Sequence, residues 1–329
     1  MKFVNQQSTL IEEKDPYKKI ELAGRTCYKS EDKITEDSAI KFCRGLIKSG
    51  HTAMVEHQVF LFEINTILEN DEDADSQMED YIEYLSSRPF FHVTTEFADP
   101  VTCDPQSYRV LVSANVRALN DMPVMDPIAI ALKDAYPELC YKAKAGSNCC
   151  PLLIAKLVDI DDYQNLSMEE YFQHKNLTYR FVTNRAVTHE LVRHRLCSFA
   201  QESTRYCAYG KSKFDGELTF IIPEGFSSWS EEFKDDYYKL LGTVEATYMK
   251  WTTAQENKAL LPQQARDILT NGLKTEIVVT ANLKEWSHIF NLRYFGTTGA
   301  PHPDIKALIG LAYKQAVADP KVKACLDNE

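Results

Sequence analysis

The sequence predicts a fold of the α+β class, and three observations support this prediction. Residues 57–65 alternate like a strand, whereas residues 229–258 have the apolar spacing of a long helix. The expected strands are joined both by short turns and by helices, without a repeating β-α-β order. The chain has 329 residues, of which 44% are hydrophobic, so it is long enough to bury a large core.

The N-terminal part is expected to contain one helix and one strand. Residues 35–48 have the composition of a helix that begins at a capping threonine and ends before Gly50. The segment HQVFLFEIN at residues 57–65 favours a strand, and its Phe60, Phe62 and Ile64 lie on one face. We therefore expect a helix–strand unit before residue 66.

Residues 66–176 are predicted to form a large insertion or small subdomain after this first strand. An acidic run at residues 69–76 is typical of a solvated loop or helix start; a helix at 78–85 and a strand at 108–113 should follow. No catalytic motif is visible in this region. We interpret the chain as a single domain, 1–329, with a core at about 1–65 and 177–318.

Regular patterning returns after residue 176. A strand is followed by a helix that Asn184 can cap, and two further strands and several helices come after it. The predicted strands are 177–182, 218–222 and 276–280, and the predicted helices are 184–195, 229–258, 262–268, 281–291 and a last one that contains Ile305, Leu308, Ile309, Ala312 and Tyr313.

One internal similarity joins the two parts of the chain. VLVSANVRALN at residues 110–120 and IVVTANLKEWS at residues 277–287 both predict a strand that enters a helix through Ala-Asn. We favour chance similarity of two such units.

The overall charge and the cysteines limit the classes of function. The formal net charge is −11, so the protein as a whole repels polyanions, and we expect no nucleic-acid partner. The nine cysteines form no C-x-x-C pair, which favours free thiols and a cytoplasmic protein without a metal site. The N-terminal residues show no secretory leader, and no apolar run approaches the ~20 residues of a membrane helix.

The segment RHRLCSFAQESTRY, residues 193–206, is locally basic within this acidic protein. On the predicted helix, Arg185, His189 and Arg193 lie along one stripe, and several cationic groups gather near its C-terminal end. In extended geometry, Ser203 and Arg205 point the same way, and a hydroxyl beside a guanidinium suits a phosphate. The residues alone therefore indicate a site for a small phosphorylated, planar ligand.

Other interpretations of this segment also deserve weight. Arginines near helix ends often form surface ion pairs of little energetic value, and composition alone does not decide between the two views. HELVRH is not a zinc-protease motif, because Arg193 stands where the second histidine should be. Ser203 has no G-x-S-x-G around it, and Cys197 and Cys207 have no visible activating group.

The spacing of the segment resembles that of a known family. Arg-His-Arg followed by seven residues and a serine, RHRLCSFAQES, is similar to the signature of the flavin-dependent thymidylate synthases, the ThyX family. RTCYKS, SGHTAMVEHQVFLFEI, ARDIL and TANLKEWSHIFNLR also resemble segments of that family. The resemblance covers about residues 20–65 and 177–315.

The resemblance implies a fold, an activity and an assembly. The fold would be an antiparallel sheet flanked by helices, in a homotetramer whose active sites are shared between subunits. The activity would be the reductive methylation of dUMP to dTMP, with methylenetetrahydrofolate as carbon donor, FAD as redox carrier and NADPH as reductant. The alternative is a non-catalytic or regulated nucleotide- or RNA-binding protein that uses the cluster Arg193–Arg205.

The resemblance also implies roles for individual residues. Arg293 would polarise the uracil ring as the catalytic residue and bind dUMP. The other dUMP-binding residues would be Glu190, Arg193, Gln201, Ser203, Arg205 and Arg266. The FAD-binding residues would be His51, Ala53, Arg193, His194, Arg195, Gln201, Asn282, Lys284 and His288.

Several of these residues have simpler explanations when they are taken singly. Asn282 alone would be interpreted as a helix cap, and His288 and Arg266 alone as surface residues. The sequence also departs from the family pattern. Ala200 replaces a residue that is often polar, and the longer link after Arg293 leaves the role of His302 open.

Overall fold

The computed structural model describes residues 1–67, 71–97, 108–141, 150–210, 214–254 and 259–328. Its centre is a four-stranded antiparallel sheet in the order β2-β7-β10-β8. The strands are β2 (Gln7–Leu10), β7 (Asn176–Asn184), β8 (Ser198–Gln201) and β10 (Lys274–Asn282). This sheet and the helices around it confirm the predicted α+β class.

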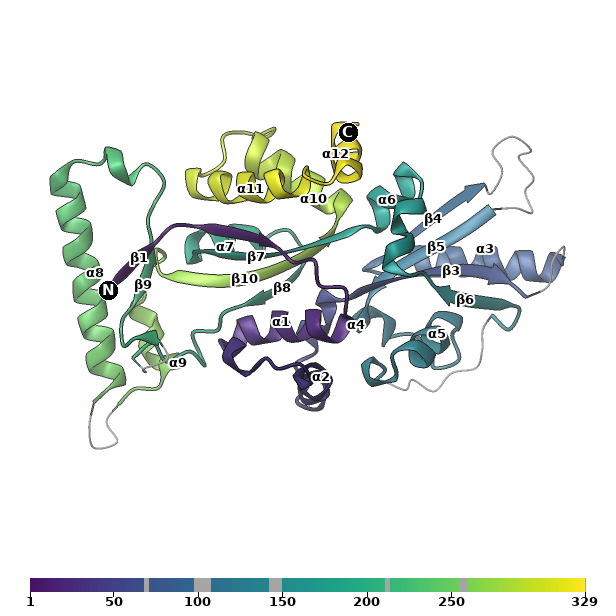
Figure 1. The fold of residues 1–329 in the computed structure, drawn as a ribbon, viewed down its shortest axis with the longest axis horizontal. Coiled ribbons are helices and arrows are strands. Elements are labelled where there is room, and N and C mark those ends of the chain that lie inside the picture. Colours follow the sequence, from purple (N-terminus) through teal and green to yellow (C-terminus); the bar gives the residue numbers. More distant parts are fainter. Residues whose placement is uncertain (68–70, 98–107, 142–149, 211–213, 255–258, 329) are drawn as a thin grey trace.

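Strand β10 is one of the two inner strands of this sheet, and its run IVVTA is apolar on both faces. Ile277 and Val279 pack into one hydrophobic core, whereas Val278 between them packs into another. Figure 1 shows α10 (Leu283–Phe290) and α11 (Pro303–Ala316) over one face and α1 (Pro16–Tyr28) over the other. The sheet is therefore a layer between helices.

A second antiparallel sheet has the order β4-β5-β3-β6. Strand β3 (Val59–Thr66) pairs with β5 (Tyr108–Asn115) on one side and with β6 (Leu153–Leu157) on the other. The fourth strand, β4 (Phe91–Phe97), lies beyond β5. Region 66–176 therefore supplies β4, β5 and β6, and these three strands form a sheet with β3, which comes before them in the chain.

A third, smaller unit lies at the opposite end of the molecule (Figure 1). Strand β1 (Lys2–Val4) runs parallel to β9 (Thr219–Ile221), and the long helix α8 (Glu231–Thr252) packs beside them. Leu241 and Tyr248 of α8 are buried, but Phe233 and Leu240 are 64% and 57% exposed. Much of the apolar surface of α8 is thus uncovered in a single chain.

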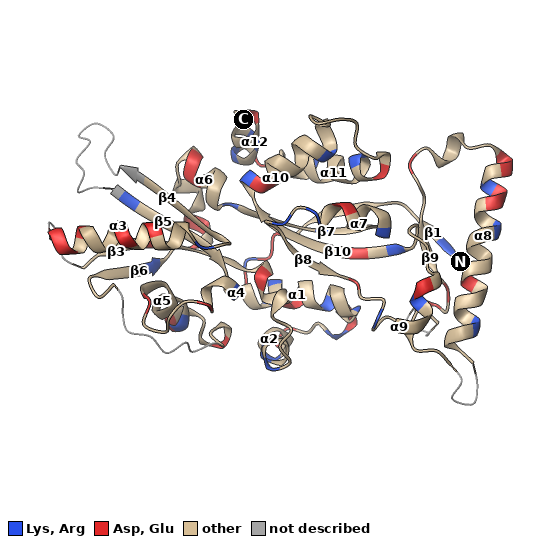
Figure 2. Cartoon of the chain, turned by 180° about the vertical axis from the view of Figure 1, so that it is seen from behind, with Lys and Arg blue, Asp and Glu red and all other residues tan. Residues whose placement is uncertain are grey.

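The other helices and the short helical turns complete the described structure. Figure 2 shows acidic residues concentrated on α3, with acidic and basic residues interspersed along α8. The helices are α2 (Ser38–Lys48), α3 (Glu72–Ser86), α4 (Val116–Leu119), α5 (Pro127–Ala135), α6 (Met168–His174), α7 (Arg185–Leu191), α9 (Pro262–Ala265) and α12 (Pro320–Asp327). Short 3-10 turns are Glu31–Lys33, Thr52–His57, Pro137–Leu139, Ile160–Asn165, Phe226–Ser228 and Arg266–Ile268, and Asn291–Phe295 is a π-helical turn.

Several predicted boundaries were wrong. Helix α3 begins at Glu72, within the acidic run, because Asp71 caps it and its first turn favours negative charge. Helix α8 ends at Thr252, and α12 follows the helix that we expected to be the last. Residues 69–70 and 255–258 of the predicted segments lie outside the described residues.

Both segments of the internal similarity use the same device. Asn115 caps α4 by accepting a hydrogen bond from the backbone of Ala118, and Asn282 caps α10 by accepting one from Glu285. A strand that enters a helix through a capping asparagine explains this local likeness.

None of the described helices is long and apolar enough to cross a lipid bilayer. Within the same ranges, no three His, Cys, Asp or Glu side chains are grouped in a way suited to a metal ion.

Candidate active site

The predicted basic helix is shorter than its sequence suggests. Asn184 caps α7 as expected, since its side chain accepts a hydrogen bond of 2.9 Å from the backbone of Val187. The helix ends at Leu191, and Arg193 and His194 lie in the turn that follows, so the helical stripe through Arg193 was wrong. The chain turns here because β8 must begin at Ser198 to pair with β10.

Arg293, in the π-helical turn after α10, contacts both the end of α7 and the turn that follows α7. Its Nη1 donates to the Glu190 carboxylate at 3.1 Å, and its Nε donates to Nε2 of His194 at 3.2 Å. Since Nε2 of His194 accepts, its proton belongs on Nδ1, which lies 3.6 Å from the Glu285 carboxylate. The ring of His288 meets that of His194 edge to face, at 5.9 Å between centroids.

The backbone that carries Arg293 is unusual. Helix α10 continues beyond Phe290 into the π-helical turn Asn291–Phe295, which is closed by Gly296 in the left-handed conformation, with a φ of 75°. Single π-helical turns are frequent at functional sites because they redirect a side chain from the regular helical path. The side chain of Arg293 remains partly exposed, so its outer face can meet a ligand.

Gln201 is held within the fold. Its amide nitrogen donates to the hydroxyl of Thr188 at 2.9 Å and to that of Thr275 at 3.3 Å. The same Thr275 hydroxyl accepts from Arg185 at 3.5 Å. Gln201 therefore joins α7, β8 and β10, which fixes the strand that precedes Ser203.

The segment from Ser203 to Cys207 is a turn, not the extended strand that we expected. The carbonyl of Ser203 accepts from the backbone of Tyr206 and Cys207, and its hydroxyl accepts from the backbone of Arg205 at 3.3 Å. Residues 198–201, where we predicted no strand, do form one. This short polar strand, β8, is stabilised by its pairing with β10.

Four arginines near these elements are exposed and make no ion pair with any described residue: Arg193, Arg195, Arg205 and Arg266. Surface ion pairs therefore do not explain the basic segment. The guanidinium of Arg205 lies 5.6 Å from the centre of the Tyr206 ring. Arg266 occupies the 3-10 turn after α9 and makes no hydrogen bond to the Arg293 cluster.

The cysteines of this segment are buried. Burial raises the pKa of the Cys197 thiol far above its ordinary value, so the thiolate is not available near neutral pH. Cys207 is also buried, at 2% exposure. Both are structural thiols, as the sequence suggested.

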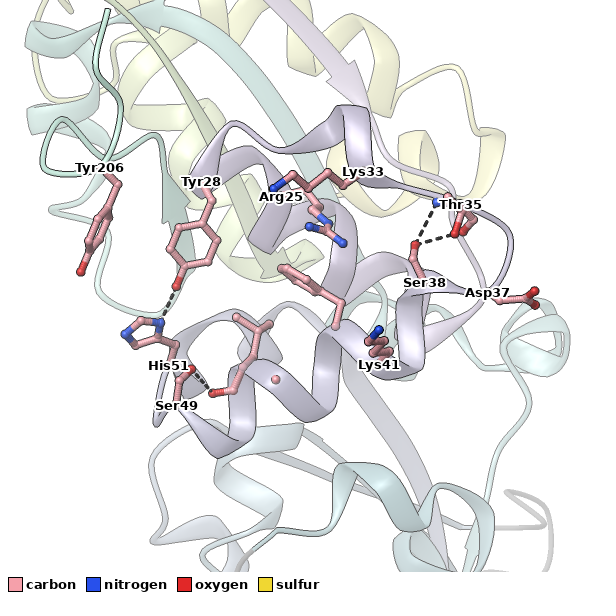
Figure 3. Close-up of a pocket in the computed structure, with 13 residues that line it drawn as sticks. Arg25, Tyr28, Lys33, Thr35, Asp37, Ser38, Lys41, Ser49, His51 and Tyr206 are labelled. Carbon is pink, nitrogen blue, oxygen red and sulfur yellow. Dashed lines mark hydrogen bonds between the residues drawn. The ribbon is translucent and has the colours of Figure 1, made fainter. Parts of the chain in front are cut away.

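A cleft of about 680 Å³ contains His51. The Tyr28 hydroxyl lies 2.5 Å from Nδ1 of His51, and the rings of Tyr28 and Tyr206 lie 6.0 Å apart (Figure 3). Ala53 lies nearby in the chain, in the 3-10 turn Thr52–His57, and is half-buried. The backbone N–H of Ser203 donates to the Cys27 carbonyl at 3.1 Å, so this cleft adjoins the Ser203 turn.

A second cleft, of about 730 Å³, contains three of the residues that were expected to bind FAD. Asn282 caps α10, which is the role that its position in the sequence suggested when it was taken alone. Its amide also donates to the Gln173 carbonyl at 2.9 Å. Lys284 and His288 project into the cleft from α10. The lining is His92, Gln173, Leu196, Asn282, Lys284, Glu285, His288 and Asn291.

His92 and Gln173 of this second cleft come from region 66–176, and the sequence gave no motif for either. Nδ1 of His92 lies 3.5 Å from the Asn282 amide nitrogen. Burial, together with the nearby Lys284, lowers the pKa of His92, so its ring is neutral at physiological pH. His92 lies on β4, and the pairing of β4 with β5 places it next to residues of α10 that are distant in the sequence.

The residues present are suited to a flavin dinucleotide. Both clefts fall within the volume range of sites for small molecules and cofactors. Arg193 and Arg195, which pair with no carboxylate among the described residues, are the donors that a diphosphate prefers. A neutral histidine and an exposed lysine beside the second cleft add hydrogen-bond donors, and Glu285 is the one carboxylate of its lining.

Comparison with known proteins identifies the family. Residues 9–68 and 138–318 match the model of the family described as "Thymidylate synthase complementing protein". That match covers more than half of the chain. The protein therefore belongs to this family.

Curated relatives include flavin-dependent thymidylate synthases. The one from Pyrococcus furiosus is 33% identical over 126 residues, and the one from Pyrococcus horikoshii is 37% identical over the same length. Each match covers 38% of this chain and 49% of the relative. The chain thus spans about half the length of the curated relatives that it matches.

Two solved structures are more distant. A UMP/dUMP methylase from Streptomyces cacaoi bound with 5-Br dUMP is 11% identical, with a TM-score of 0.40 over 100% of this chain and 97% of that one. Thymidylate synthase X from Helicobacter pylori with FAD and dUMP is 14% identical, with a TM-score of 0.34 over 46% and 73%. Both TM-scores are below 0.5, so the family assignment rests on the sequence match.

Proposed function

We propose that the protein is a flavin-dependent thymidylate synthase, which converts dUMP to dTMP with methylenetetrahydrofolate, FAD and NADPH. The observation that carries this proposal is Arg293, whose guanidinium is held by Glu190 and by His194. The residues on either side of His194 in the sequence, Arg193 and Arg195, are exposed and make no ion pair with any described residue. Family membership and the names of the matched relatives support the same activity.

In this proposal Arg293 stabilises negative charge on the uracil ring. Carbon C5 of the pyrimidine becomes a nucleophile only as electron density moves onto the ring, and a fixed cation beside the ring lowers that barrier. Glu190 and His194 fix the guanidinium through two different nitrogens, so it needs little reorganisation during the reaction. Arg293 acts through charge and position and forms no covalent bond.

The nucleotide phosphate is assigned to the Ser203 turn. Arg205 offers a bidentate guanidinium, and Ser203 adds a short hydroxyl donor. Glu190, Arg193, Gln201 and Arg266 complete the proposed dUMP site. The turn geometry supports this assignment because it brings the Arg205 backbone back onto the Ser203 hydroxyl.

FAD, when bound, supplies the redox capacity that carries reducing equivalents from NADPH to the one-carbon unit. Four of its proposed ligands line the two clefts, His51 in the first and Asn282, Lys284 and His288 in the second. The full set of proposed ligands is His51, Ala53, Arg193, His194, Arg195, Gln201, Asn282, Lys284 and His288. Asn282 would contribute mainly by fixing the start of α10, since its side chain is already used for the cap.

We also propose a cytoplasmic homotetramer with shared active sites. The exposed Phe233 and Leu240 on α8 support assembly, because large apolar side chains on one helix favour burial against another copy. Sedimentation of the purified protein would measure the assembly directly. A monomer at micromolar concentration would contradict this part of the proposal.

The visible spectrum and a turnover assay test the proposed activity. The purified protein should show flavin absorbance that bleaches with NADPH, and it should release tritium from dUMP labelled at C5 when the carbon donor is added. A colourless protein that FAD does not restore would contradict the proposal. Binding of RNA that weakens steeply with salt, without turnover, would instead favour the nucleic-acid alternative.

A further inference from the structure

Two further clefts meet beside β2, which forms the edge of the central sheet opposite β8. Their volumes are about 620 Å³ and about 470 Å³. We call the region that lines both clefts the junction pocket. Its charged residues and its tyrosine are Glu13, Lys14, Lys19, Asp161, Tyr163 and Lys175. None of these residues has a role in the proposed function.

Two lysines of the junction pocket have no ion-pair partner. Lys19 comes from α1, and Lys175 directly precedes β7. Among the described residues, neither ammonium group forms an ion pair or a hydrogen bond. Burial, together with the nearby Lys175, lowers the pKa of Lys19 to about 8, and burial also lowers the pKa of Lys175. The two ammonium groups therefore repel each other where little water screens them.

Tyr163 adds a hydroxyl group to the same place. The residue lies in the 3-10 turn Ile160–Asn165 and is buried, with 8% exposure. Its hydroxyl makes no hydrogen bond with a described residue, although the residue lines both clefts. Burying a hydroxyl without a partner is unfavourable, so a ligand or water is needed to satisfy it. Tyr163 therefore points to a ligand that carries hydrogen-bond acceptors.

The two carboxylates of the junction pocket are engaged with other groups. The side chain of Glu13 accepts a hydrogen bond of 2.8 Å from the backbone of Asp15. Asp161 pairs with Lys14 at the exposed side of the pocket. Neither Glu13 nor Asp161 forms an ion pair with Lys19 or Lys175. The ammonium groups of both lysines thus remain available to an anion.

Other charged or titratable side chains surround the two lysines. The charged ones are Glu12, Asp15, Asp159, Asp319 and Lys321. Burial raises the pKa of the phenols Tyr17, Tyr136 and Tyr171, and burial beside Lys19 lowers the pKa of His57 to about 3. These phenols and this histidine are therefore neutral near pH 8, where Lys19 titrates.

We propose that the junction pocket binds a phosphate group. Lys19 and Lys175 would neutralise the dianion, and the Tyr163 hydroxyl would donate to one of its oxygens. The anion would remove the repulsion between the two ammonium groups and supply the acceptor that Tyr163 lacks. Both clefts are larger than a phosphate group, so the rest of a small phosphorylated molecule can extend into either one. This inference does not depend on the proposed function.

Selective acetylation of lysines, mapped by peptide mass spectrometry, tests the pocket at the residue itself because only neutral amines react. Sulfate is the probe, since it is a tetrahedral dianion whose charge is constant between pH 6 and 9. At pH 8 and constant ionic strength, replacing chloride by sulfate should slow acetylation of Lys19 at least about fivefold, because an anion raises the pKa of the ammonium group. Lys18, an exposed residue of α1 outside both linings, is the internal control and should change less than about twofold.

Variants test whether the three donors act together. The sulfate concentration that gives half of the protection of Lys19 should rise at least about fivefold in Lys175→Gln, and about threefold in Tyr163→Phe, which removes only the hydroxyl. Lys18→Gln removes a charge from the same helix and should change this concentration less than about twofold. Equal protection in all of these variants, or no protection in the wild type, would overturn the inference.

Calorimetry supplies a second measurement that does not require a reactive amine. Since the anion raises the pKa of Lys19, sulfate binding at pH 8 should take up more protons in the wild type than in Lys19→Gln, and the two proteins should not differ at pH 6. Equal proton uptake at pH 8 would contradict the proposed site. Phenyl phosphate then distinguishes the sources of the group: tighter binding than that of inorganic phosphate indicates a phosphate ester, and equal binding indicates free phosphate.

Discussion

Arg293 is the residue on which the proposed chemistry depends most. Its guanidinium reaches both Glu190 and His194, and these contacts leave one face for a ligand. Arg293→Ala should lower kcat at least about 100-fold, the usual loss when a fixed charge-stabilising donor is removed. The flavin spectrum should remain. Tritium release from dUMP, measured with saturating donor, checks this prediction.

Arg293→Lys is the informative comparison for that experiment. Lysine keeps the charge but loses the two-nitrogen geometry that engages Glu190 and His194. We expect turnover between those of the wild type and the alanine variant. Near-normal turnover in Arg293→Ala would contradict the proposed role.

His92 is the second residue with a measurable role. Its neutral ring lines the second cleft beside Asn282 and Lys284. His92→Ala should raise the Kd for FAD roughly three- to tenfold, because one hydrogen-bonding group and its packing are lost. Flavin fluorescence titration measures the Kd. Thr95→Ala, an exposed position on the same strand, serves as control, and an equal Kd for both variants would refute the role of His92.

The sequence predicted part of this arrangement at the residue scale. The family resemblance assigned Glu190, His194 and Arg293 to the expected site, and in the structure Arg293 contacts both of the others. Their roles toward dUMP and FAD stay predictions. His92 was not predictable, because a single histidine in a region without a motif gains its position only from long-range strand pairing.

At the scale of elements, the strongly patterned segments were predicted well. Strands β3, β7 and β10 lie where their apolar runs indicated, and α7 starts at its predicted cap. Short elements were missed, among them β1, β2 and β8. Each is three or four residues long, and its existence depends on a partner strand distant in the chain.

The start of α10 permits a test at the same scale. Asn282 both caps the helix and donates to the Gln173 carbonyl. Asn282→Ala should lower the free energy of unfolding by about 1–3 kcal/mol, since both bonds are lost. Asn282→Asp keeps the capping acceptor but not the donor, so its loss should be smaller. Urea denaturation measures both; equal losses would show that the cap contributes little.

For the whole molecule, two buried histidines predict a pH dependence of stability. Burial lowers the pKa of His57 and His174 to about 3. The Thr280 hydroxyl lies 2.9 Å from Nδ1 of His57, and the hydroxyls of Ser113 and Thr94 lie 2.8 Å from the two ring nitrogens of His174. The unfolded chain binds these protons near pH 6.5, whereas the folded chain does not. Stability should therefore be complete above about pH 6.5 and fall by about 1.4 kcal/mol per pH unit for each histidine as the pH decreases toward 3.

Replacement of one histidine tests this pH dependence. His174→Gln should reduce the slope of unfolding free energy against pH between about 6.5 and 5, even if it also lowers stability at pH 7. His302→Gln changes an exposed histidine and is the control. Urea unfolding at constant ionic strength gives the slopes, and an unchanged slope in His174→Gln would contradict the assignment.

Strand β3 has a consequence for the integrity of the chain. Its two hydrogen-bonding neighbours, β5 and β6, both belong to region 66–176, while its Leu61 and Phe62 enter different cores. If this region were excised, β3 would present two bare edges and an apolar face to water, which is the template for edge-to-edge aggregation. A shortened chain would therefore precipitate instead of yielding a smaller enzyme.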